Sequence, residues 1–242
     1  MKNKKNILSN IISIFFAIFI ALIIRSFFAE PFNIPSGSMK PNLLVGDFIF
    51  VSKWSYGYSK HSLPFSIPLI PNKIFSKNPK RGDIVVFKTP KDNRTDYIKR
   101  VIGLPGDKIK IVNGSIIIND NLIYKKKLND FIDTDKNTNI KRIRKYKEFF
   151  FEKEIEILDL IDQGVVDNTN LFNVPDGHFF VMGDNRDNSQ DSRFLSSVGY
   201  IPFENLVGKA QFIFFSLENS RFLEFWKWPK AIRTERLLKK IK

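Results

Sequence analysis

The sequence predicts a mostly β protein that carries one apolar helix at its N-terminus. Short runs of β-branched and aromatic residues recur between residues 47 and 215, and Gly, Pro, Asn and Asp separate them. A charge-free run of 19 residues, 6–24, precedes these runs. The chain has 242 residues, enough for one substantial domain and a smaller second one. We therefore expect a single transmembrane helix, followed by a β-rich core with a β-rich inserted second domain.

Residues 6–28 are predicted to form an uncleaved membrane anchor. The charge-free run is mostly Ile, Phe, Leu and Ala, and as a helix it would span about 28 Å, close to the hydrocarbon thickness of a bilayer. A cleaved signal peptide is disfavoured because it needs a shorter apolar run and small residues before the cut, whereas Phe27 stands two positions before Ala29. The length and the flanking charges also disfavour a buried core helix.

The charges on either side of the anchor predict its orientation. Lys2, Lys4 and Lys5 precede the charge-free run, and Arg25 closes it. Because lysine and arginine accumulate on the cytoplasmic side of membrane helices, we expect residues 1–5 in the cytoplasm. The chain after about residue 29 is then expected outside.

The β-rich core is predicted in two pieces, residues 29–118 and 173–218. Within the first piece, a Pro-Gly-Asp sequence at 105–107 and an Asn-Gly pair at 113–114 are typical of turns between strands. The runs that favour strands are 47–53, 83–88, 97–102, 108–112, 115–118, 179–182 and 209–215.

Residues 119–172 differ in composition from the core. They are rich in Lys, Asn, Asp and Ile and lack the glycine-punctuated motifs found on either side. We interpret them as an inserted smaller domain. Within it, the pattern of residues 149–161 fits a strand or an amphipathic helix equally well.

The C-terminal residues 219–242 mix aromatic and basic side chains. Trp226 and Trp228 flank Lys227, a combination that suits a membrane–water interface. A short helix packed on the domain, with a frayed basic end, explains the same composition. Both interpretations of this tail, which we expect near the membrane, stay open.

The composition excludes several classes of function. The chain has no cysteine, which rules out disulfides, thiolate metal sites and thiol catalysis. The net charge is +14, but the basic residues are widely spread and no nucleic-acid-binding motif accompanies them. We therefore expect attraction to anionic phospholipid and no nucleic-acid partner.

A serine and a lysine stand in two separate, specific motifs. Ser38 lies in a stretch stiffened by Pro35 and Pro41, and Lys99 lies within a predicted strand. A serine hydroxyl needs a neighbouring base before it can act as a nucleophile, and a lysine serves if burial keeps it neutral. His178 leaves a Ser-His-Asp triad open, although it is less favoured at the start of an apolar strand.

A third motif runs from Gly183 to Arg193. Its acidic residues do not have the spacing of an EF-hand calcium loop, and we expect no metal or other cofactor. We interpret it as a rigid loop in which Asp184 and Asp191 pair with Arg186 or Arg193. Such a loop would support Ser38 and Lys99, with Ser189 able to hydrogen-bond the lysine amine.

With these motifs in this order behind an anchor, the chain resembles the bacterial type I signal peptidases, also called leader peptidases. The similar segments cover most of residues 30–110 and 175–215. They include Ser36–Leu43, Gly46–Val51, Arg81–Phe87, Asp96–Asp107 and Gly183–Arg193.

The resemblance implies roles for individual residues. Ser38 would be the nucleophile and Lys99 the general base of a Ser-Lys pair. Ser36 and the backbone amide of Ser38 would form the oxyanion hole. Ser189 would orient the lysine amine, while Asp191 and Arg193 brace the site. The residues expected to line the substrate groove are Phe32, Ile34, Pro35, Met39, Asp96, Tyr97 and Ile98.

The resemblance also implies an activity and a location. The chain would be a membrane-bound serine endopeptidase that removes signal peptides from exported preproteins, cutting after small residues at the −3 and −1 positions. We expect it in the bacterial plasma (inner) membrane, with the catalytic domain on the outer side, acting as a monomer. Asn42 departs from the family's usual threonine, with little effect expected.

Two other proteins would share parts of this pattern. A self-cleaving repressor protease uses Ser-Lys chemistry, but it would have a DNA-binding domain where this chain has its anchor. A membrane-tethered module that only binds exported segments would not need Ser38, Lys99 and Ser189, all of which are present.

Overall fold

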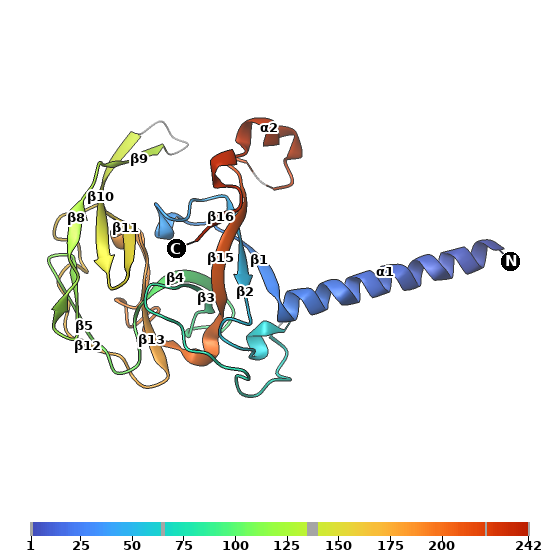
Figure 1. Ribbon diagram of the computed structural model, residues 1–242, viewed down its shortest axis with the longest axis horizontal. Helices are drawn as coiled ribbons and strands as arrows, with labels where there is room; N and C mark the ends of the chain where they lie inside the picture. Colours follow the sequence, from blue (N-terminus) through green and yellow to red (C-terminus); the bar gives the residue numbers. More distant parts are fainter. Residues whose placement is uncertain (1, 64–65, 135–139, 221, 242) are drawn as a thin grey trace.

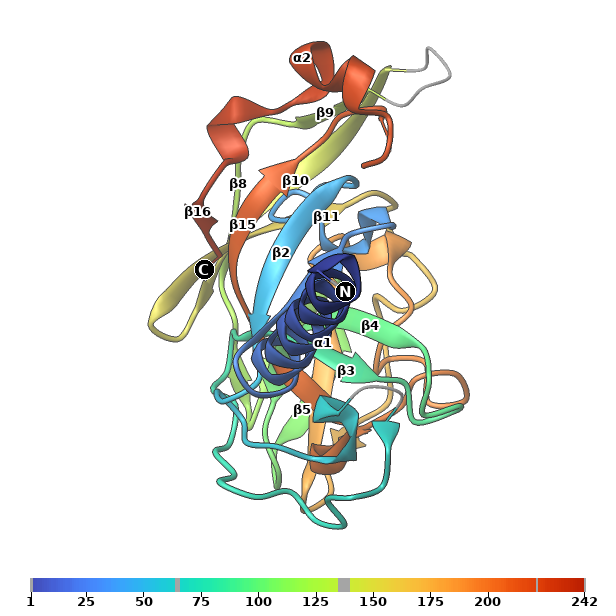
Figure 2. The same cartoon turned by 90° about the vertical axis from the view of Figure 1, so that its right-hand side faces the viewer.

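The structure, a computed structural model, describes residues 2–63, 66–134, 140–220 and 222–241. A long helix, α1 (Lys2–Phe27), projects from a β-rich body (Figure 1). Within the described residues it is the one helix long and apolar enough to cross a membrane, over Ser9–Phe27 with a mean hydropathy of 2.2. Seen along its axis, the helix leaves the body near the middle of one face (Figure 2). This arrangement agrees with the predicted anchor.

The main sheet is antiparallel and contains eight strands. Its strand order is β1-β2-β15-β3-β4-β13-β14, and β16 pairs with β15. The strands are β1 (Ala29–Asn33), β2 (Asp47–Ser52), β3 (Ile84–Lys88), β4 (Asp96–Gly103), β13 (His178–Met182), β14 (Ile201–Pro202), β15 (Leu206–Ser216) and β16 (Lys239–Lys240).

Two smaller sheets complete the body. One contains β8 (Lys125–Lys127), β9 (Phe131–Thr134), β10 (Ile140–Phe150) and β11 (Lys153–Asp159). The other contains β5 (Lys108–Val112), β6 (Ser115–Ile118), β7 (Asn121–Leu122) and β12 (Phe172–Asn173). The predicted mostly β fold is therefore confirmed, and residues 153–159 form a strand rather than a helix.

Alternating side chains of the main sheet enter different apolar clusters. On β4, Val101 packs in one cluster while Ile102 packs in another. On β13, Phe180 packs in the cluster of Ile102, together with Phe150 and other apolar residues of the smaller sheets. The two faces of a strand thus bury different partners, as the alternation of a pleated strand requires. The division of residues 119–172 into a separate domain stays a prediction.

The C-terminal segment packs against the body through its basic residues. It contains the short helix α2 (Trp228–Ala231), and β16 adds to β15. Arg236 is buried and pairs with Asp47 of β2 at 2.5 Å. The basic end is therefore not frayed, whereas Leu223 and Trp226 expose most of their surface.

Candidate active site

A helical turn after β1 presents Ser38. The turn (Gly37–Met39) is held from below, because Met39 and Leu43 are buried in the core cluster that also contains Ile34. Ser38, within this turn, is itself buried. The apolar residues on either side therefore fix the backbone that carries the hydroxyl.

Lys99 reaches Ser38 from the middle of β4. Pairing with β3 sets Lys99 opposite Val85, and its side chain is only 4% exposed. The Lys99 Nζ donates a hydrogen bond to the Ser38 Oγ at 2.7 Å. Removal of the ammonium from water lowers the pKa of Lys99 to about 8, although the charges of Asp191 and Asp184 act in the opposite direction. The two residues are 61 positions apart in the sequence, and the fold brings them together.

Ser36 lies beside the same hydroxyl. Its Oγ is 3.4 Å from the Ser38 Oγ, and either atom can be the donor. The Ser36 hydroxyl can therefore rotate to donate a hydrogen bond to a negatively charged oxygen that develops on a substrate carbonyl next to Ser38.

The motif 183–193 holds the serine turn from the other side. The Asn185 backbone N–H donates to the Ser38 carbonyl at 3.0 Å, and the Asn185 side-chain amide donates to the Gly37 carbonyl at 3.0 Å. There is no room for a side chain at Gly183, since a Cβ there would lie 2.6 Å from the Ser38 carbonyl oxygen and 2.3 Å from the Ser189 Oγ. The motif is thus part of the wall behind the nucleophile.

The charged residues of this motif pair differently from the prediction in one respect. Asp191 pairs with Arg193 at 2.8 Å, as expected. Asp184, however, pairs with Arg100 of β4 at 2.7 Å rather than with Arg186 or Arg193, because Arg186 instead pairs with the buried Glu148 of β10. The Asp184–Arg100 pair fastens the motif to the strand that carries Lys99.

Asn42 is a residue whose importance the sequence pattern did not reveal. Its side-chain amide donates to Asp184 at 2.7 Å and to the Glu156 carbonyl at 2.8 Å. It therefore joins the serine loop, the motif 183–193 and β11. Its difference from the usual threonine was noticed in the sequence, but the partners of its amide lie more than 100 residues away.

Ser189 lies inside the site without a hydrogen bond. Its Oγ is buried and has no partner among the described residues. The expected contact with the Lys99 amine is therefore not formed in this structure, and the orienting role stays a prediction.

The residues predicted for the groove fall into two groups. Phe32 on β1 and Tyr97 and Ile98 on β4 are partly buried at the apolar clusters. Ile34 and Met39 are buried in the core itself, Asp96 is exposed at the start of β4, and Pro35 is exposed before the serine turn.

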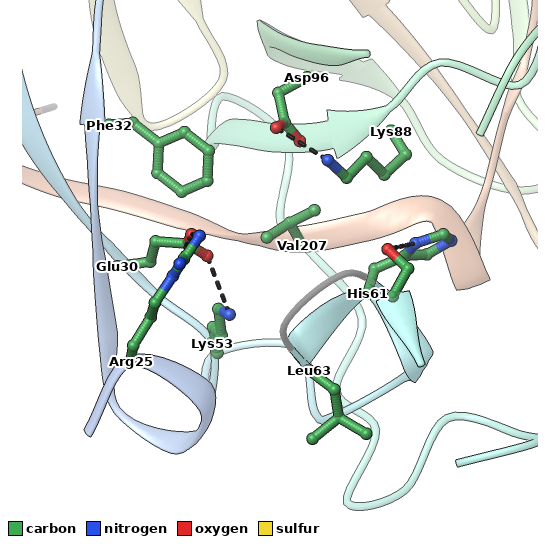
Figure 3. A pocket seen from close by; sticks show the side chains of 10 residues that line it. Arg25, Glu30, Phe32, Lys53, His61, Leu63, Lys88, Asp96 and Val207 are labelled. Atoms are coloured by element: carbon green, nitrogen blue, oxygen red, sulfur yellow. Dashed lines mark hydrogen bonds and ion pairs between the residues drawn. The ribbon is translucent and has the colours of Figure 1, made fainter. Parts of the chain in front are cut away.

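A charged cavity lies between β1 and β4. Its volume is about 110 Å³, and Glu30, Phe32 and Asp96 line it together with seven other residues. Figure 3 shows Glu30 next to Lys53 and Asp96 next to Lys88, ion pairs of 2.9 and 2.8 Å. The two strands therefore face each other across a shared space.

Neither histidine is hydrogen-bonded to Ser38 or Lys99 in the described residues, although His61 lines the charged cavity (Figure 3). His178 begins β13, and its Nδ1 is 2.9 Å from the Asp176 carbonyl, while the Nδ1 of His61 is 3.2 Å from the Ser66 hydroxyl. His178 is five residues before Gly183, which puts it roughly 15 Å along the strand from the serine turn. Among the described residues, no group of His, Cys, Asp and Glu is arranged to hold a metal ion.

Comparison with known proteins identifies the family. The profile of the family described as "Signal peptidase, peptidase S26" matches residues 7–215. The signal peptidase I of Rickettsia typhi is 41% identical over 99% of this chain and 96% of its own length, and that of Rickettsia conorii is 42% identical over 91% and 88%. A crystal structure of a signal peptidase I from Enterococcus faecalis, 25% identical, covers 55% of this chain and 97% of its own with a TM-score of 0.33. The chain belongs to the signal peptidase family, peptidase S26, and is a serine endopeptidase that removes signal peptides from preproteins.

Proposed function

We propose that this peptidase works through Ser38 as nucleophile and Lys99 as general base. The observation that carries the proposal is the 2.7 Å contact between the Ser38 Oγ and a buried lysine amine whose pKa is about 8. A base with a pKa near the working pH is able to take the serine proton without help from histidine.

The proposed reaction has two halves. Neutral Lys99 takes the Ser38 proton while the Oγ attacks the carbonyl carbon of the scissile bond. The Ser36 hydroxyl and the Ser38 amide would stabilise the oxyanion. Lys99 then gives its proton to the leaving amine, and an acyl-enzyme on Ser38 remains. Water, activated by Lys99, hydrolyses this ester and releases the signal peptide.

The edges of β1 and β4 support binding of the precursor as an added strand. In the described part of the chain, β1 pairs only with β2, and residues 96–99 of β4 pair only with β3, because pairing with β13 begins at Arg100. An extended peptide can hydrogen-bond to such free edges. We propose that it does so with small side chains at the −3 and −1 positions, near Phe32, Tyr97 and Ile98.

We also propose that α1 crosses the bacterial plasma membrane with the N-terminus in the cytoplasm and the body outside. The flanking lysines and the apolar span support this orientation. The exposed aromatic residues of the C-terminal segment and the net charge of +14 support contact with anionic lipid. We propose a monomer that binds no nucleic acid.

The test is cleavage of a purified precursor with an Ala-x-Ala site by the full chain in detergent. Lys99→Ala should abolish cleavage, whereas His178→Ala and the surface variant Lys110→Ala should not. Loss of activity in His178→Ala with survival of Lys99→Ala would replace the proposed base by a histidine. A folded wild type that does not cleave would favour a binding module instead.

A further inference from the structure

An exposed apolar loop lies near the end of the first third of the sequence, before β3. We define the apolar loop as residues 66–75, which precede β3. Leu69 is 75% exposed and Phe75 is 80% exposed, and Ile67 and Ile74 also expose large parts of their side chains. Contiguous apolar exposure of this kind marks an interaction surface rather than ordinary surface variation.

The loop is attached to the last turn of α1. Tyr58 donates from its hydroxyl to the Phe27 carbonyl at 2.8 Å, and the rings of the two residues meet edge to face at 5.5 Å. Tyr58 and Ile74 exchange two backbone hydrogen bonds of 2.9 Å each. The loop therefore has a fixed place next to the point where α1 meets the body.

The loop is also held so that its apolar side chains point away from the core. Lys73 donates to the carbonyls of Leu206 at 2.6 Å and Phe203 at 3.2 Å, which fastens the loop to the main sheet. Phe75 has a φ of +51°, a left-handed conformation that is unfavourable for an aromatic residue. A strained backbone that exposes a phenylalanine ring persists only where surrounding contacts impose it.

The loop belongs to the face from which α1 leaves. In Figure 2 that face is turned to the viewer, with α2 at its upper end, α1 near the middle and the segment preceding β3 at its lower end. The exposed Leu223 and Trp226 lie just before α2. Trp54 is half exposed next to Lys53, whose backbone N–H donates to the Phe28 carbonyl at 3.1 Å. Segments that expose apolar side chains thus lie on both sides of α1 on this face.

We propose that the apolar loop inserts into the interface of the bilayer that α1 crosses, with Leu69 and Phe75 among the lipid headgroups and upper acyl chains. Aromatic and aliphatic side chains bind at this depth in interfacial segments. The loop and the C-terminal aromatic segment then contact the membrane at opposite ends of one face. The inference rests on α1 as the membrane anchor and not on the catalytic roles.

Because the chain has no cysteine, single-cysteine labelling tests the proposal cleanly. The variants Leu69→Cys and Phe75→Cys would carry a polarity-sensitive fluorophore on the full chain, reconstituted at low density in vesicles of phosphatidylcholine and phosphatidylglycerol. Val165→Cys is the matched control, since Val165 is apolar, 95% exposed and close to the β5–β6 turn, away from α1. Ala17→Cys reports on the anchor itself.

Labels at 69 and 75 are expected to emit at shorter wavelength than the label at 165. Aqueous iodide should quench them much less than it quenches the label at 165, and brominated lipid should quench them. If they match the label at 165 while the label at 17 lies in lipid, the loop does not enter the bilayer and a protein partner would be needed to cover it. If the label at 17 is also open to iodide, α1 is not in the membrane and the inference falls with it. The readout requires no cleavage, so a failed catalytic assignment would leave the result standing.

Discussion

Lys53, directly after β2, and Lys99, on β4, are both buried lysines, but their partners differ. Lys53, 2% exposed, pairs with the carboxylate of Glu30 at 2.9 Å and donates to the Ser62 carbonyl at 2.7 Å. Lys99 donates to the hydroxyl of Ser38, and among the described residues no carboxylate lies within ion-pair distance of its amine. Burial lowers the pKa of both, but Glu30 counteracts this directly at Lys53.

The comparison shows how a buried lysine becomes a base. A contacting carboxylate stabilises the ammonium and keeps the side chain a structural cation. Where the contact is a hydroxyl, burial is opposed only by more distant charges. The nearest chemical partner, more than burial itself, then separates the two roles.

The largest expected effect comes from removing the amine at Lys99. Lys99→Ala should lower kcat by roughly a thousandfold or more, because the serine proton has no other acceptor nearby. Lys53→Ala is the matched control: it should lose stability and keep its kcat when folded. Single-turnover cleavage of a precursor measures both, and an equal loss of kcat in the two variants would contradict the separation of roles.

A smaller effect is expected when Ser38 is moved away from Lys99. In Gly183→Ala the new Cβ would lie only 2.6 Å from the Ser38 carbonyl oxygen, so the serine turn must shift. A displacement of about 1 Å is sufficient to cost roughly a hundredfold in rate. Gly177→Ala, where a Cβ meets no atom within 4 Å, provides a control for general strain, since its φ is +69°. Unchanged kcat in Gly183→Ala would mean that the wall behind the nucleophile is not needed.

Glu30→Gln should leave Lys53, like Lys99, without a contacting carboxylate. We expect a loss of about 2 kcal/mol in the free energy of unfolding at pH 7, because a buried ammonium loses a charged hydrogen-bond partner. A lysine whose pKa is lower in the folded than in the unfolded state destabilises the fold while protonated. The deficit should therefore shrink as pH rises toward 10. Chemical denaturation at pH 7 and pH 10 gives the comparison; an equal deficit at both would argue against Lys53 as its source.

The smallest expected effect is a displacement of the pH profile when the charge of Asp191 is removed. Since neutral Lys99 is the proposed base, kcat/KM should fall about tenfold per pH unit below its pKa of about 8 and level off above it. Asp191→Asn removes a charge that raises this pKa, so the acid limb should move to lower pH. A limb that stays in place in Asp191→Asn would show that this carboxylate does not act on the base.

The sequence predicts much of the fold because its strands have clear local signals. Residues 84–88 and 108–112 are β-branched runs bounded by glycine or proline turns, and both are strands in the structure. Residues 149–161 gave no such signal, since alternating Glu and Ile at 154–157 fit two periods. Pairing of β11 with β10, a tertiary contact, decides that conformation.

The residues proposed for the site stand out in the sequence, but the contacts between them do not. Ser38 and Lys99 stand out through their motifs, yet their contact depends on the register of β4 against β3. The choice of Arg100 as the partner of Asp184 depends on burial, which no charge pattern encodes. Asn42 bonds two segments that are remote in sequence, so its local surroundings carried no sign of them.

The join between α1 and β1 fixes how far Ser38 can lie from the end of the helix. Arg25 pairs with Glu30, and Phe27 and Phe28 accept hydrogen bonds from the body, so the helix continues into the strand edge without a slack linker. Only ten residues separate Phe27 from Ser38. With α1 in the bilayer as proposed, the join holds the Ser38 hydroxyl at a fixed height above the lipid. We therefore expect the cut position in a precursor to depend on its distance from the membrane as well as on the fit of its side chains.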